Sequence, residues 1–102
     1  MITRAGERLA VQGAMTFAEA VRLREALLKE LDRDALTVDL GAVAEADSTA
    51  LSLMLEWRRA AKARGWRIHY TNLPENLRSL AEVYGVLELI ANPEATAAPA
   101  ST

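Results

Sequence analysis

The chain has 102 residues and a formal net charge of -2, with 51% apolar and 25% charged side chains, a composition typical of one globular domain. This charge offers no basic field for nucleic acid, and the absence of cysteine excludes disulfides and thiolate metal sites and favours a reducing cytosol. No apolar run approaches the roughly 20 residues that span a bilayer, so we expect no direct membrane insertion.

The first third of the chain predicts one strand and one helix. Residues 8–13 alternate between apolar and polar side chains, which indicates a short strand. Thr16 and Glu19 then match a capping box, with Thr16 as N-cap and Glu19 reaching back. Large apolar side chains follow near helical spacing and predict a packed face. These are Phe17, Val21, Leu27, Leu28 and Leu31.

The middle third predicts a strand, a short loop and a long helix. Residues 36–40 alternate and predict a strand that ends at Gly41, after which a loop leads to Asp47. Residues 50–64 form an amphipathic helix that stops at Gly65. The apolar stripe of this helix contains Trp57, and this position favours packing of the Trp57 ring in the core over contact with a partner protein. Leu51 and Leu55 lie on an adjoining strip and are expected to provide exposed apolar contacts.

The last third predicts a strand over residues 66–70 and a helix that begins near Pro74 and closes at Gly85. In this helix Leu77, Leu80, Ala81 and Tyr84 share one face. Residues 86–90 form a last buried turn or an edge segment. The tail, 92–102, holds prolines and small residues and is expected to be disordered. One domain over residues 1–91 follows, with helices packed on a central sheet.

The segment Asp47-Ser48-Thr49 stands between a predicted strand and a predicted helix. A helix start leaves N–H groups unpaired and carries the positive end of the helix dipole. Asp47 or Ser48 would therefore serve as N-cap, a contribution of roughly 0.5–2 kcal/mol relative to alanine. Two adjacent hydroxyls exceed the need of one cap. The second hydroxyl is left to face a partner or to accept a phosphate.

Catalytic and metal chemistry finds few candidates in this chain. His69 is the only histidine of the chain, and Ser48 could act as a nucleophile only with His69 within hydrogen-bond distance. The residues around Ser48 also lack the pattern of a nucleophile elbow. Asp39, Glu45 and Asp47 could form a Mg²⁺ site, but such loop carboxylates are more often caps and solvated charges. No glycine-rich phosphate loop is present. We expect no enzyme activity, no metal and no cofactor.

The chain resembles the STAS domain family in three respects. These are the order of its elements, the segment Asp47-Ser48-Thr49-Ala50-Leu51, and the stretches over residues 72–77 and 80–86. Within this family the chain is similar to the small STAS subunits of bacterial Mla phospholipid transporters. The resemblance implies an α/β fold with a central mixed sheet and helices packed on it. It also implies a non-catalytic cytoplasmic accessory subunit. Such a subunit docks on the ATPase of an inner-membrane ABC transporter that maintains the lipid asymmetry of the outer membrane.

The resemblance also assigns roles to single residues. Ser48 occupies the place of the hydroxyl that contacts the ATPase, and Thr49 matches the position that anti-sigma-factor antagonists present for phosphorylation. We expect a docking patch made of Asp47, Ser48, Thr49, Leu51 and Leu55.

An alternative role is a phosphorylation-controlled anti-sigma-factor antagonist, modified at Thr49 or Ser48. Antagonists commonly have glycine where this chain has Ala50, and the added Cβ weighs against close approach of a kinase. Pairing of the isolated chain into a homodimer is left open by the sequence.

Overall fold

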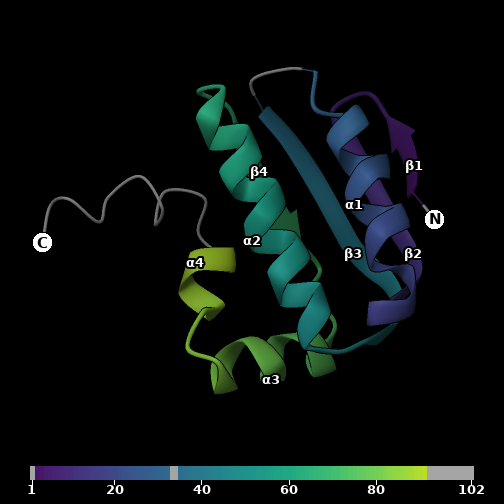
Figure 1. The fold of residues 1–102 in the computed structure, drawn as a ribbon, viewed down its shortest axis with the longest axis vertical. Helices are drawn as coiled ribbons and strands as arrows, with labels where there is room; N and C mark the ends of the chain where they lie inside the picture. Colours follow the sequence, from purple (N-terminus) through teal and green to yellow (C-terminus); the bar gives the residue numbers. More distant parts are fainter. Residues whose placement is uncertain (1, 33–34, 92–102) are drawn as a thin grey trace, which may run out of the picture.

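The computed structural model describes residues 2–32 and 35–91, so the predicted disorder of the tail lies outside the described residues. The elements form one α/β layer structure (Figure 1). In chain order they are β1 (Ile2–Ala5), β2 (Arg8–Met15), the 3₁₀ turn η1 (Phe17–Glu19), α1 (Ala20–Lys29), β3 (Ala35–Ala46), α2 (Ser48–Ala63), β4 (Arg67–Thr71), α3 (Glu75–Val83) and α4 (Leu87–Ala91).

The four strands form a mixed sheet in the order β1-β2-β3-β4, which confirms the predicted architecture. β1 and β2 are antiparallel, whereas β2, β3 and β4 run parallel. Leu9, Val38 and Tyr70 lie opposite one another and are all buried. The helices cover this side of the sheet (Figure 1). Among the described helices none is both long and apolar enough to cross a membrane.

Two strands differ from the sequence expectation. β1 was not predicted, because its four residues are too few to establish a period. The predicted end of a strand at Gly41 is wrong, since β3 continues to Ala46. The Gly41 N–H donates to a carboxylate oxygen of Asp39 at 2.8 Å, and the pairing of β2 with β3 shifts register nearby. The strand continues past this register shift to Ala46 and delivers Asp47 directly to α2.

The core lies between the sheet and the pair α1 and α2. Trp57 is 0% exposed, which confirms its core position, and its Nε1 donates to the carbonyl of Arg24 at 3.3 Å. The buried face of α1 is set by Leu23 and Leu27. Val21, which lies two residues before Leu23 and so on the opposite side of the helix, is 69% exposed. Its predicted place in the packed face is wrong.

Arg58 is a buried charge that the sequence pattern did not single out. It is 4% exposed, and its Nη2 donates to the carbonyl oxygens of Ile68 at 3.2 Å and Ile90 at 2.8 Å. Its guanidinium lies over the ring of Tyr70, whose hydroxyl donates to the carbonyl of Met54 at 2.6 Å. Burial lowers the pKa of Arg58 and raises that of Tyr70. This cluster joins α2, β4 and α4.

Candidate functional site

The carboxylate of Asp47 connects the starts of two helices. Its Oδ1 accepts a hydrogen bond from the Thr49 N–H at 2.9 Å, which confirms Asp47 as the N-cap of α2. Its Oδ2 accepts one from the Phe17 N–H at 3.1 Å. The predicted capping box is wrong, because the Thr16 side chain makes no cap hydrogen bond and Glu19 pairs with Arg22 at 3.4 Å. One carboxylate thus fixes η1 and α2 relative to each other.

These hydrogen bonds should make stability depend on Asp47 and on pH. The bond from the Phe17 N–H, followed by those from Thr49, holds the pKa of Asp47 below its usual 3.8, although partial desolvation opposes this shift. A carboxylate with a lowered folded pKa stabilises the fold above its unfolded pKa and loses that contribution as pH falls through the folded pKa.

We therefore expect Asp47→Ala to lower the free energy of unfolding by about 1–2 kcal/mol near neutral pH. The gap between variant and wild type should narrow well below pH 3.8, where the wild-type carboxyl also becomes neutral. Urea unfolding followed by circular dichroism at both pH values measures this gap. A gap of constant size would contradict the role of the ionised carboxylate.

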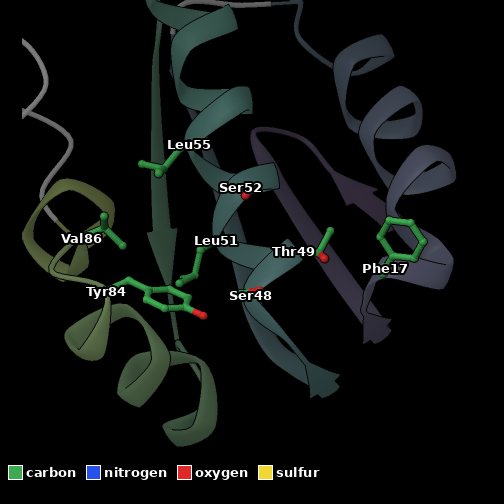
Figure 2. A pocket seen from close by; sticks show the side chains of 8 residues that line it. All are labelled: Phe17, Ser48, Thr49, Leu51, Ser52, Leu55, Tyr84 and Val86. Atoms are coloured by element: carbon green, nitrogen blue, oxygen red, sulfur yellow. The ribbon is translucent and has the colours of Figure 1, made fainter.

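A groove opens along the first half of α2 (Figure 2), with a volume of about 540 Å³. Ser48, Thr49 and Ser52 place hydroxyls along it. Phe17 of η1 stands on one side of α2, and Tyr84, at the end of α3, stands on the other (Figure 2). Eight residues line it in all: Phe17, Ser48, Thr49, Leu51, Ser52, Leu55, Tyr84 and Val86.

The structure brings four of the five predicted patch residues to this groove. Ser48 is exposed, and Thr49 and Leu55 are half-buried. Leu51 is only 3% exposed, so the expectation that it offers exposed apolar surface is wrong. The chain turns back after α3 and lays Tyr84 beside Leu51 (Figure 2). Asp47 is not among the lining residues and acts through its hydrogen bonds.

The exposure of the two aromatic walls was not predicted from the sequence. Helical spacing predicts a packed position for Phe17, which is wrong, and it places Tyr84 only on the same helix face as Leu77. Phe17 is 80% exposed and Tyr84 is 56% exposed. The sequence pattern also did not indicate Ser52 and Val86 as groove residues. Ser52 could have been found, since it lies four residues after Ser48 and hence on the same face of the helix. Exposed aromatic side chains beside a groove are typical of protein interaction sites.

The alternatives that need catalytic or metal chemistry find no support in this geometry. His69 lies in register with Thr37 on the sheet face away from the helices, and it lines a different pocket from Ser48. Asp39 accepts hydrogen bonds from Gly41, Arg8 and Asn72, which lower its pKa. Within residues 2–32 and 35–91, no group of three or more His, Cys, Asp or Glu side chains could hold a metal ion.

Solved structures share the fold over most of the chain. The anti-sigma factor antagonist SpoIIAA in its unphosphorylated form is 13% identical, with a TM-score of 0.71 over 99% of this chain and 95% of that one. A sulfate transporter family protein from Wolinella succinogenes is 20% identical, with a TM-score of 0.67 over 83% and 70%. The STAS domain of a SulP transporter from Vibrio cholerae is 18% identical, with a TM-score of 0.59 over 87% and 72%.

The family of the chain is identified by comparison of its sequence with family models. No curated protein sequence matches the chain. A family model described as the Mlab STAS domain matches residues 1–91, which include β1 to α4 and every residue that lines the groove. The chain therefore belongs to the STAS domain family, in its MlaB-like branch.

Proposed function

We propose that this protein is a non-catalytic, cytoplasmic accessory subunit that binds the ATPase of an inner-membrane ABC transporter for phospholipids. The observation that carries the proposal is the groove of an MlaB-like chain, in which hydroxyls of Ser48, Thr49 and Ser52 lie between two exposed aromatic rings. Polar groups set among apolar anchors give a protein interface both direction and affinity.

Binding at this groove would act on the ATPase without any chemistry by the chain itself. A subunit that binds only the folded ATPase stabilises it by mass action. If it binds one arrangement of the ATPase dimer more tightly than another, it also shifts the population between them. Both effects would support the lipid asymmetry of the outer membrane by controlling the transporter.

Replacement of Ser48 by lysine tests the docking role. Ser48 is exposed at the first position of α2, so the fold should tolerate the change, while a long cation would stand in the groove. We expect at least tenfold weaker association with the ATPase of the Mla-type transporter from the same organism, measured by co-purification and biolayer interferometry.

Ser79→Lys is the matched control, because Ser79 is an exposed serine of α3 that does not line the groove. It should leave association unchanged. Thr49→Lys should act like Ser48→Lys, with its folding checked by circular dichroism because Thr49 is half-buried. Undiminished binding by both the Ser48 and the Thr49 variants would remove the groove from the docking role.

A second candidate function is that of an anti-sigma-factor antagonist controlled by phosphorylation of Thr49 or Ser48. The observation that favours it is the position of Ala50, which is 0% exposed. Its methyl group is buried in the core, and so does not stand in the way of a kinase at the groove. Incubation with a partner-switching kinase and ATP, followed by mass measurement, separates the two functions. Phosphate on Thr49 together with failure to bind the ATPase would favour the antagonist.

A further inference from the structure

The exposed strip of α2 continues beyond the groove to a positive charge. Ser48, Ser52, Leu55 and Arg59 follow one another at helical spacings of four, three and four residues, which places them on one face. Arg59 is exposed and lies one turn after Leu55, about 6 Å further along the helix axis. The strip thus runs from hydroxyls through an apolar centre to a guanidinium.

Arg59 differs from the arginines that hold the outer elements together. Arg4 pairs with Glu30 and Asp32, and Arg24 pairs with Glu56, the residue that lies three positions before Arg59 on the same helix. Over the part of the chain that the structure describes, Arg59 itself makes no ion pair. A carboxylate from another molecule could approach it without displacing an internal partner.

The shape of the groove indicates what kind of segment carries that carboxylate. Its floor is two turns of a straight helix, and its walls are the rings of Phe17 and Tyr84. Grooves of this kind take the apolar face of an amphipathic helix, whose anchors recur at three and four residues. A volume of about 540 Å³ accommodates large side chains from successive turns.

We propose, on the basis of the docking role above, that the groove binds one amphipathic helix of the partner protein. Its apolar face lies between Phe17 and Tyr84, and an acidic side chain at one end of that face pairs with Arg59. The acidic side chain sets the direction of the bound helix, because the opposite orientation would bring it to the end of the groove beside the Asp47 carboxylate, whose like charge repels it. Arg59 is therefore a specificity residue, and the two aromatic rings supply most of the affinity.

A displayed library of helical peptides tests this even while the sequence of the partner helix is unidentified. Apolar anchors are kept at helical spacing, the surface positions are randomised, and peptides are selected on the full-length chain and on Arg59→Glu. We expect Asp or Glu to be enriched at one end of the apolar face on the wild type, and Lys or Arg at the same position on Arg59→Glu. Arg78→Glu is the matched control, since Arg78 is an exposed arginine of α3 outside the groove lining.

Binding of one selected acidic peptide is then measured by calorimetry. It should be at least tenfold weaker to Arg59→Glu, unchanged for Arg78→Glu, and weaker for wild type as salt is raised. The proposal is overturned if no peptide binds, if no position shows a charge preference, or if selected peptides bind equally to a variant without the two aromatic rings.

The transporter ATPase gives the second arm of the experiment and separates this inference from the proposed function. If the ATPase does not bind but the peptides still show their charge preference, the transporter role is wrong and the helix-binding role of the groove still holds. ATPase binding that is sensitive to Ser48→Lys but not to Arg59→Glu, together with peptides that show no charge preference, would overturn the acidic helix alone.

Discussion

Removal of both aromatic rings in Phe17→Ala/Tyr84→Ala should weaken association with the ATPase by about a thousandfold, because anchor residues at interface centres contribute about 2 kcal/mol each. Folding should change little, since Phe17 is 80% exposed and Tyr84 is 56% exposed. Surface truncations of this kind usually alter the free energy of unfolding by about 0.5 kcal/mol or less. Biolayer interferometry and urea unfolding measure the two quantities on the same preparations.

Val83→Ala is the control for this prediction. Val83 is 79% exposed and adjoins Tyr84, but it does not line the groove. Its truncation removes exposed apolar surface near the site and should leave the affinity unchanged. Equal losses in the control and in the double variant would mean that general surface hydrophobicity, and not the groove, drives association.

Trp57→Ala should have the largest effect on stability, a loss of about 3–5 kcal/mol. The ring is 0% exposed between α1, α2 and the sheet, and the change also leaves the Arg24 carbonyl without the hydrogen bond from Nε1. Because small domains are stable by only about 5–15 kcal/mol, the variant should unfold at much lower urea concentration. Far-UV circular dichroism follows the transition without relying on tryptophan fluorescence.

Trp66→Ala provides the comparison within the same chain. Trp66 is partly exposed just before β4, and its ring contacts the guanidinium of Arg64 with 5.3 Å to the centroid. Its truncation should cost clearly less than that of Trp57. Similar losses for the two tryptophans would contradict the placement of the core between the helices and the sheet.

Features coded by neighbouring residues could be predicted from the sequence. The start of α2 at an Asp47 cap, its end before Gly65 and the burial of its Trp57 stripe all follow from local preferences and helical period. The position of Ser48 and Thr49 at the mouth of that helix followed in the same way. These elements depend on residues within a few positions of one another and not on the rest of the chain.

Features created by contacts between distant segments could not be predicted in this way. The helical period identifies large apolar side chains, but it does not tell which of them the sheet covers, so it places Phe17 wrongly in the packed face and does not reveal that Tyr84 is exposed. The capping of η1 by Asp47 joins residues that are 30 positions apart. The groove itself exists only because the fold places η1 on one side of α2 and the end of α3 on the other (Figure 2).

The bridge made by Arg58 has a consequence for how the sheet meets other chains. Sheet edges with unsatisfied carbonyls invite a foreign strand, and β4 is an outer strand of this sheet. Here the Arg58 guanidinium donates one hydrogen bond to the Ile68 carbonyl and another to the carbonyl of Ile90 in α4. The other border, β1, is only four residues long and carries Arg4, which is engaged with Glu30. Strand addition is thereby discouraged at both borders, so recognition by another chain falls to the faces of the molecule, among them the helical layer that carries the groove.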